Sequence, residues 1–178
     1  MKMYVFVTYG QPGSGKTFTS TRLAKDLNLT HLNSDRVRLR LFRNPEYTVA
    51  ENQIVFTAMD LIAESLLGSR TSIIYDGNLT KKEFRTRVYK LARKYHAKPF
   101  LLWFDTPIQS SITRVAKRST LKSKKLREIH RPIDEEVIHR LKANMQDPTN
   151  EPVIKLDGLA TYKKQKDVIL RAIKSAVK

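Results

Sequence analysis

The sequence lacks cysteine, and this absence excludes disulfide bonds and metal sites that depend on thiolate ligands. No apolar run approaches the ~20 residues that cross a bilayer, so we expect no membrane association. Linkers, internal repeats and low-complexity tracts are also missing, so we expect a single domain over residues 1–178. The short apolar start leads straight into a glycine-rich loop. We therefore interpret it as a strand rather than a secretory signal, and expect a cytoplasmic protein.

Acidic residues are scarce. The chain has 34 Lys and Arg residues against 17 Asp and Glu residues, which gives a formal net charge of +17 at pH 7. Such a charge attracts polyanions and speeds their encounter with the protein. The charge therefore favours a nucleic-acid partner, although a lysine-rich proteome would produce the same excess of basic residues. The four histidines show no metal-ligand spacing and are interpreted as ordinary side chains.

The most informative motif lies at residues 10–17, where Gly-Gln-Pro-Gly-Ser-Gly-Lys-Thr fits the phosphate-binding pattern G-x-x-x-x-G-K-[ST]. A strand-like run at 4–8 precedes it and a helical stretch follows it, which is the context that this motif requires. The alternative is a glycine-rich turn that binds nothing.

The residue types of this loop suit a nucleoside triphosphate. Its glycines allow backbone angles that a β-carbon would obstruct, so successive N–H groups can point into one concavity at the start of a helix. Lys16 would reach the β- and γ-phosphates, and the Thr17 hydroxyl would ligate Mg²⁺. We therefore expect ATP and Mg²⁺ as cofactors, held by Gly13, Ser14, Gly15, Lys16 and Thr17.

Apolar strands alternate with amphipathic helices along the chain. The strand-like runs lie at 4–8, 72–75, 99–104 and 153–156, with a weaker one near 30–32. The apolar spacing between them is helical, and a last helix is predicted from about 162 to 177. This alternation predicts an α/β fold with a parallel sheet of about five strands, covered by helices on both faces.

Aspartates follow or end three of the first four predicted strands, where parallel α/β sheets carry their chemistry. Asp76 ends an apolar strand, where a carboxylate would hold Mg²⁺ directly or through water. An ordinary Asp-Gly-Asn turn is the alternative. Asp35 follows the weak strand and would accept a proton from an attacking hydroxyl, with Arg38 one helical turn later to orient the acceptor. The alternative is that Ser34 or Asp35 only caps a short helix.

A basic segment follows the fourth strand. Residues 114–131 hold eight Lys or Arg residues and one acid. Arg114 and Arg118 lie one helical turn apart and share a helix face. A mobile lid, predicted at about 119–131, would place positive charge over the departing phosphate and exclude water. A solvated basic loop is the alternative.

Together these motifs resemble one branch of the P-loop kinases, a nucleoside-kinase-like group of P-loop NTPases. The matching features are Gly-x-Pro-Gly-Ser-Gly-Lys-Thr, Asn-Ser-Asp-x-x-Arg, a long helix and an apolar strand ending in Asp-Gly-Asn. Further matches occur at 104–107, 132–138 and 147–151, so the resemblance spans about 4–156. This branch includes phage-type polynucleotide 5′-kinases, zeta-toxin-like kinases and small kinases of unassigned substrate.

The resemblance implies a role for individual residues. Asp35 would be the general base, and Arg38 would bind the acceptor's phosphate or help to orient it. Arg118 would be the lid arginine on the ATP phosphates, and Asp76 falls on the family's Asp-x-Asn position. The implied catalytic residues are thus Lys16, Asp35, Arg38 and Arg118, with Arg114 also on the nucleotide and Thr17 and Asp76 on the metal.

Three functions remain open at this point. The first is an ATP-dependent kinase for the 5′-hydroxyl of RNA or DNA, favoured by the Asp35-x-x-Arg38 spacing and the net charge. The second is a kinase for a small acceptor such as a nucleoside, sugar, antibiotic or sugar nucleotide. The third is a nucleotide-dependent protein that binds RNA without modifying it.

Overall fold

The computed structural model describes residues 2–120 and 133–176, and in these residues five parallel strands form one sheet. The strand order is β2-β3-β1-β4-β5. The strands are β1 (Tyr4–Tyr9), β2 (Thr30–Asn33), β3 (Ile73–Asp76), β4 (Lys98–Asp105) and β5 (Val153–Asp157). Each strand predicted from the sequence is present, and the predicted parallel α/β sheet is confirmed.

Helices connect these strands. They are α1 (Lys16–Asp26), α2 (Ser34–Leu41), α3 (Val49–Gly68), α4 (Lys82–Lys94), α5 (Ile108–Thr120), α7 (Glu135–Ala143) and α8 (Tyr162–Ser175). The last helix ends two residues before the predicted limit. Of the predicted lid, 119–131, only the first two residues are described, as the end of α5, and the others lie outside the described residues. In the described parts of the chain, no helix is both long and apolar enough to cross a membrane.

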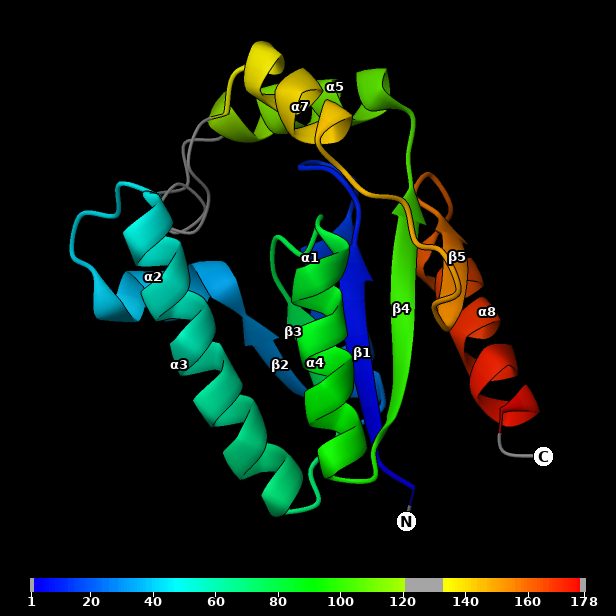
Figure 1. The fold of residues 1–178 in the computed structure, drawn as a ribbon. Helices are drawn as coiled ribbons and strands as arrows, with labels where there is room; N and C mark the ends of the chain where they lie inside the picture. Colours follow the sequence, from blue (N-terminus) through cyan, green and yellow to red (C-terminus); the bar gives the residue numbers. More distant parts are fainter. Residues whose placement is uncertain (1, 121–132, 177–178) are drawn as a thin grey trace.

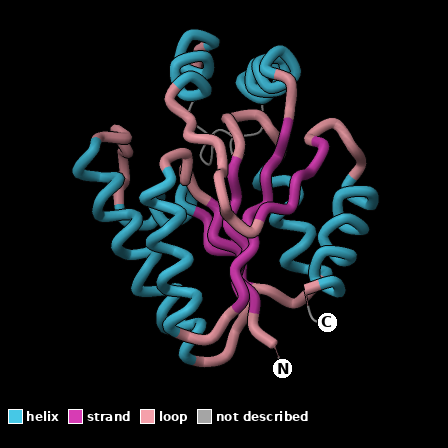
Figure 2. The backbone as a smooth tube through the Cα atoms, turned by 45° about the vertical axis from the view of Figure 1, so that its right-hand side comes forward, coloured by secondary structure: helices cyan, strands magenta, loops and turns pink. Residues whose placement is uncertain are grey.

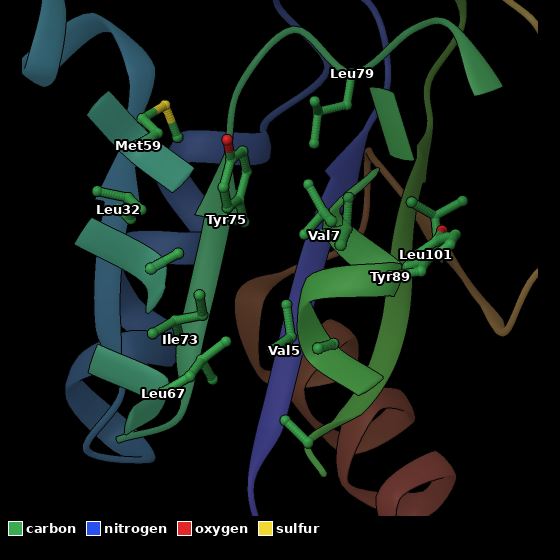
Figure 3. Packing of buried hydrophobic residues seen from close by; sticks show 14 of the residues in the cluster. Val5, Val7, Leu32, Met59, Leu67, Ile73, Tyr75, Leu79, Tyr89 and Leu101 are labelled. Atoms are coloured by element: carbon green, nitrogen blue, oxygen red, sulfur yellow. The ribbon is translucent and has the colours of Figure 1, made fainter. Parts of the chain in front are cut away.

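The two faces of the sheet are covered by different helices (Figures 1 and 2). Successive side chains of a strand point to opposite faces, so β1 contributes to both cores. Val5 and Val7 pack on the face covered by α3 and α4, and Figure 3 shows them with Met59 and Tyr89 from these helices. Phe6 packs on the opposite face with residues of α1 and α8. The predicted covering of both faces is confirmed.

The carboxyl ends of the strands meet at one edge of the sheet, and α5 and α7 lie above this edge (Figure 1). The register between β2 and β3 pairs Asn33 with Asp76, so the last residues of the two strands lie side by side. The loop after β1 opens at the same edge, because β1 lies next to β3. The fold therefore gathers the polar residues that follow several strands into one place.

Candidate active site

The glycine-rich loop between β1 and α1 adopts a conformation that glycine tolerates best. Gly13 has a φ of 83° and Gly15 a φ of 100°, both in the left-handed region. A side chain at Gly13 would also collide with the carbonyl oxygen of Ser111. Gln11 holds the loop from the side, since its Nε2 donates to Thr106 O at 2.6 Å and to Ser111 Oγ at 3.1 Å. The loop is thus attached to the connection between β4 and α5 and to the first turn of α5.

Two side chains of this loop are arranged to receive an anion. The Lys16 ammonium donates to the carbonyl oxygens of Gly10 at 2.6 Å and Gln11 at 3.0 Å. Burial lowers the pKa of Lys16 to about 8, although nearby carboxylates raise it in part. The Ser14 hydroxyl is buried and has no hydrogen-bond partner among the described residues. A phosphate group would give both side chains a strong acceptor, so these residues fit the triphosphate of a nucleotide.

Asp76 is the centre of a polar cluster beside the loop. Its Oδ1 accepts from Thr8 Oγ1 at 2.9 Å, and its Oδ2 accepts from Asn33 Nδ2 at 2.9 Å and Thr17 Oγ1 at 3.1 Å. The Nε2 of His31 lies 2.8 Å from the same Oδ2. Burial alone would raise the pKa of Asp76, but the hydrogen bond and charge of His31 and its other partners hold it below its ordinary value. Asp76 is therefore a fixed negative charge.

This cluster fits a Mg²⁺ ion held through Thr17 rather than directly by Asp76. The Oδ2 atom of Asp76 already has three partners, whereas the Thr17 hydroxyl donates to Asp76 and keeps its oxygen lone pairs for a metal. In the described residues no group of three or more His, Asp or Glu side chains could enclose a metal. Mg²⁺ usually takes the rest of its ligands from water and phosphate oxygens.

Asp35 lies in the first turn of α2, next to this cluster. The cap of the helix is Asn33, which accepts a hydrogen bond from Arg36 N at 3.0 Å. The alternative expectation that Ser34 or Asp35 caps the helix is therefore wrong. Among the described residues, none donates a hydrogen bond to the Asp35 carboxylate.

The electrostatic environment of Asp35 is opposite to that of Asp76. Burial and the negative charge of Asp76 raise the pKa of Asp35, and the charges of Arg38 and Lys16 lower it only in part. A carboxylate with a raised pKa and no hydrogen-bond donor among the described residues is suited to take up a proton. Two of the charges that shift the pKa of Asp35 come from Asp76, in the polar cluster around Thr17, and from Lys16 in the phosphate-binding loop.

Arg38 points into the protein rather than toward the open edge of the sheet. Only 3% of its surface is exposed. Its Nη1 donates to Glu51 Oε2 at 2.9 Å, its Nη2 donates to Asn52 Oδ1, and its guanidinium lies over the ring of Tyr47. Glu51 also accepts from the backbone N–H of Glu46 and Tyr47. In this structure Arg38 attaches α2 to the start of α3, and both of its terminal nitrogens are engaged.

The two arginines of α5 approach the loop from above. Arg114 Nη1 donates to the carbonyl oxygen of Gly13 over a long 3.5 Å. Burial and the neighbouring charge of Arg114 lower the pKa of Arg118. The charge of Arg118 in turn contributes to the lowered pKa of Lys16, which places Arg118 within electrostatic range of the loop. The described residues thus bring Lys16, Thr17, Asp35, Asp76 and Arg118 to one edge of the sheet.

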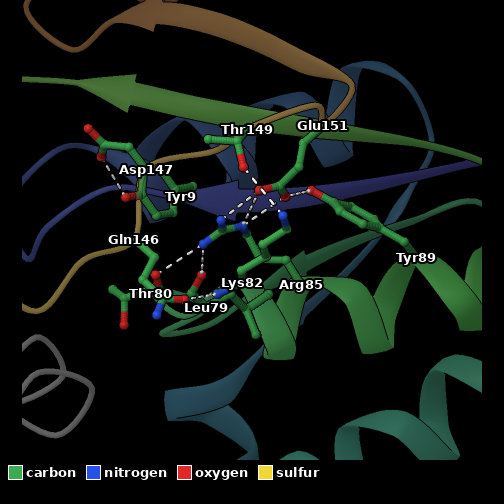
Figure 4. A network of polar contacts seen from close by, with 10 residues as sticks. All are labelled: Tyr9, Leu79, Thr80, Lys82, Arg85, Tyr89, Gln146, Asp147, Thr149 and Glu151. Atoms are coloured by element: carbon green, nitrogen blue, oxygen red, sulfur yellow. Dashed lines mark hydrogen bonds and ion pairs between the residues drawn. The ribbon is translucent and has the colours of Figure 1, made fainter.

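A second polar network contacts the last residue of β1, directly before the phosphate-binding loop (Figure 4). Tyr9 precedes the loop directly, and its hydroxyl donates to Asp147 Oδ1 at 2.9 Å. Its ring lies under the guanidinium of Arg85, which is fully buried and forms an ion pair with Glu151 at 2.6 Å. Tyr89 donates to the same carboxylate. The segment after α7 is therefore fixed to α4 and to the base of the loop.

Sequence reasoning missed His31 and Gln11. The spacing of the histidines predicts that His31 is an ordinary side chain, yet it contacts Asp76. A signal for this existed, because residues two apart on a strand share a face, so His31 lies on the same side of β2 as Asn33. Gln11 occupies a variable position of the loop motif, and its partners lie about a hundred residues away, in the β4–α5 connection and in α5, so no local pattern indicates its role.

Comparisons with known proteins agree with this architecture. Residues 5–148 match the sequence model of the AAA domain family. Among curated proteins, none matches the sequence of the chain. Kti12 from Chaetomium thermophilum, in complex with ADP-AlF3, superposes with a TM-score of 0.75 at 16% identity, over 96% of this chain and 97% of that one.

Two enzymes also superpose along nearly their whole length. A gluconokinase from Sinorhizobium meliloti 1021 has a TM-score of 0.70 at 13% identity, with 98% of this chain and 93% of that chain covered. The APS kinase CysC of Mycobacterium tuberculosis, in complex with AMPPNP and APS, has a TM-score of 0.66 at 18% identity, with 97% and 98% covered. At these identities the likeness establishes the fold, which is a kinase-like P-loop NTPase fold.

Proposed function

Because the chain belongs to the AAA domain family and carries a complete phosphate-binding loop, we propose that it is an ATP-dependent kinase for a small organic acceptor. It would transfer the γ-phosphate to a hydroxyl group of that acceptor. The observation that carries this proposal is the environment of Asp35. Its pKa is raised, and it has no hydrogen-bond donor among the described residues, which suits a general base beside a phosphate site.

Each residue of the site would have a distinct role in the transfer of the γ-phosphate. Bound Mg·ATP supplies the phosphoryl group, with the metal ion neutralising its charge. Lys16 and the loop N–H groups would orient the phosphates, and Arg118 would add positive charge from above. Thr17 would hold the metal, with Asp76 fixing the direction of its hydroxyl. The oxygen of the acceptor hydroxyl would bond to the γ-phosphorus while the bond to ADP breaks, and Asp35 would accept the proton that this hydroxyl loses.

A small acceptor is favoured by two observations. The structural neighbours include a sugar kinase from Janibacter and a gluconokinase, both named for small acceptors. In addition, Arg38 would have to leave Glu51 and Asn52 before it could bind the phosphate of a polynucleotide. Breaking a buried ion pair of this kind is costly, since it leaves Glu51 without its partner charge.

A second candidate acceptor is the 5′-hydroxyl of RNA or DNA. The net charge of +17 favours it, because a kinase for a small sugar has no need of such a field. Binding of a polynucleotide would weaken steeply with salt, since each neutralised phosphate releases counterions.

A transfer assay with labelled ATP distinguishes these acceptors. Purified protein is incubated with Mg·[γ-³²P]ATP and, in separate reactions, sugars, sugar acids, nucleosides, and 5′-hydroxyl RNA and DNA oligonucleotides. The Lys16→Ala variant serves as the blank, because it removes the phosphate-binding ammonium. We expect label on at least one small hydroxyl compound and none in the blank.

Each other result has a defined meaning. Label confined to oligonucleotide ends, and lost as salt is raised, would replace the small acceptor with the polynucleotide. No label on any acceptor, together with tight Mg·ATP binding, would contradict the kinase proposal and favour a nucleotide-dependent binding protein.

A further inference from the structure

One face of α3 is exposed and carries no charged side chain along three turns of the helix. The exposed residues include Ile54, of which 51% is accessible, and Leu61, of which 63% is accessible. Ala50 and Thr57 are exposed on the same side. These four residues, here called the outer stripe, are spaced by four, three and four, which is the spacing of a helix–helix seam. A helix that is apolar on more than its core face normally has a partner on the second face.

The charge distribution singles out the same helix. Residues 44–69 contain no Lys or Arg, although the whole chain has 34 of them. The three acidic residues of α3 are turned toward neighbouring elements of the same chain. Glu51 pairs with Arg38, Asp60 with Arg87 and Glu64 with Lys94. The outer stripe is therefore an uncharged surface on a strongly basic protein.

We propose that the outer stripe binds the outer stripe of a second copy of this chain, with the two α3 helices antiparallel about a two-fold axis. Two molecules of charge +17 repel each other, and the repulsion is smallest where each presents a surface without cations. A two-fold interface also requires a self-complementary surface. Both conditions point to a second copy rather than to an anionic partner, which would bind the basic surfaces instead.

The order of large and small residues in the outer stripe meets the second condition. With the axis between residues 55 and 56, Ile54 faces Thr57 of the partner subunit, and Leu61 faces Ala50 of the partner subunit. Each large side chain is thus placed opposite a small one, as knobs-into-holes packing requires. A parallel arrangement would place like residues together and lose this match.

The size of the contact determines its strength. A pair of single helices buries less than the roughly 1,200–2,000 Å² of a stable interface, so the dimer is expected to be weak and concentration-dependent. Sedimentation over a wide range of protein concentration should show a reversible monomer–dimer equilibrium. The Ile54→Lys/Leu61→Lys variant should sediment as a monomer throughout. Leu159→Lys, at an exposed apolar residue outside the stripe, should behave as wild type.

Disulfide cross-linking tests the antiparallel register, because the natural chain has no cysteine to interfere. In the Ala50→Cys/Leu61→Cys variant, the two thiols of one helix are about 16 Å apart and cannot bond to each other. Across the proposed interface they face one another. Mild oxidation should therefore give a covalent dimer of the double variant, while Leu61→Cys alone stays monomeric.

Two results would overturn the proposal. A wild-type protein that remains monomeric at every concentration, with no cross-link in the double variant, would exclude self-association and leave the stripe to a different protein. Efficient cross-linking of the single Leu61→Cys variant would contradict the antiparallel register. Circular dichroism of each variant establishes that it is folded, so either result can be interpreted. Phosphate transfer plays no part in this test, which is therefore independent of the proposed function.

Discussion

Two carboxylates at the same edge of the sheet have opposite electrostatic environments, and this difference assigns their roles. Asp76 has donors on both oxygens, which hold its pKa down and keep it charged. Asp35 has no hydrogen-bond donor among the described residues, and burial raises its pKa. Pairs of acids whose pKa values are separated by their surroundings commonly divide into a fixed charge and a proton carrier. The geometry thus favours Asp76 for the metal side and Asp35 for the acceptor side.

This difference predicts a stability effect of Asp35→Asn. The folded state holds the Asp35 proton more tightly than the unfolded state, so the contribution of this group to stability falls as the pH rises above its ordinary pKa of 3.8. Replacing it with a neutral amide should therefore raise the free energy of unfolding at pH 7, and the gain should shrink toward pH 4. Urea unfolding at both pH values measures this.

The matched control is Asp167→Asn, at an exposed position on α8. This variant should unfold like the wild type at both pH values. If Asp35→Asn were instead the less stable protein at pH 7, Asp35 would stabilise α2 and the account of its environment would be wrong.

At the scale of helices and strands, the sequence predicted what local patterns encode. The apolar, strand-like run before the loop and the helical spacing after it identified β1 and α1, and the other four strands were predicted from similar runs. The contacts of Arg85 were not predictable in this way, because its partner Glu151 lies 66 residues away. The partner of Arg38 also comes from another helix, so the spacing between Asp35 and Arg38 gave no sign of the ion pair with Glu51.

The network between α4 and the segment before β5 predicts a large effect for Arg85→Met. Both side chains of the Arg85–Glu151 pair are buried, so removing the arginine leaves an uncompensated carboxylate. Such a change costs about 3–5 kcal/mol of folding free energy. Denaturant titration of the variant measures the loss directly.

Arg87→Met is the matched control, because Arg87 also lies on α4 and pairs with a carboxylate. Its pair with Asp60 is partly exposed, with 45% of the arginine side chain accessible, so its loss should cost less than about 1 kcal/mol. Equal losses in the two variants would mean that burial of the Arg85 pair contributes nothing. The Arg85→Met/Glu151→Met double variant should recover part of the lost stability, since neither charge remains.

At the scale of the whole molecule, a sheet with the order β2-β3-β1-β4-β5 brings the loop after β1 next to the end of β3, with the end of β2 one strand further along the same edge. The sequence predicted that polar residues follow the strands, but strand order depends on contacts between distant segments, and no local pattern encodes it. The distribution of charge over the surface also depends on contacts between distant segments. Sequence alone gives +17, whereas the structure shows that the acids of α3 pair with neighbouring elements and leave one uncharged face.

We propose that this edge of the sheet has a nucleotide half and an acceptor half, with Asp35 in the acceptor half. The most direct test is the rate of γ-phosphate transfer by Asp35→Asn saturated with Mg·ATP, using the acceptor that the labelled assay identifies. We predict Mg·ATP affinity close to wild type and a transfer rate lower by about 10²–10⁴-fold, the usual contribution of a general base. A variant that transfers phosphate at the wild-type rate would contradict the claim.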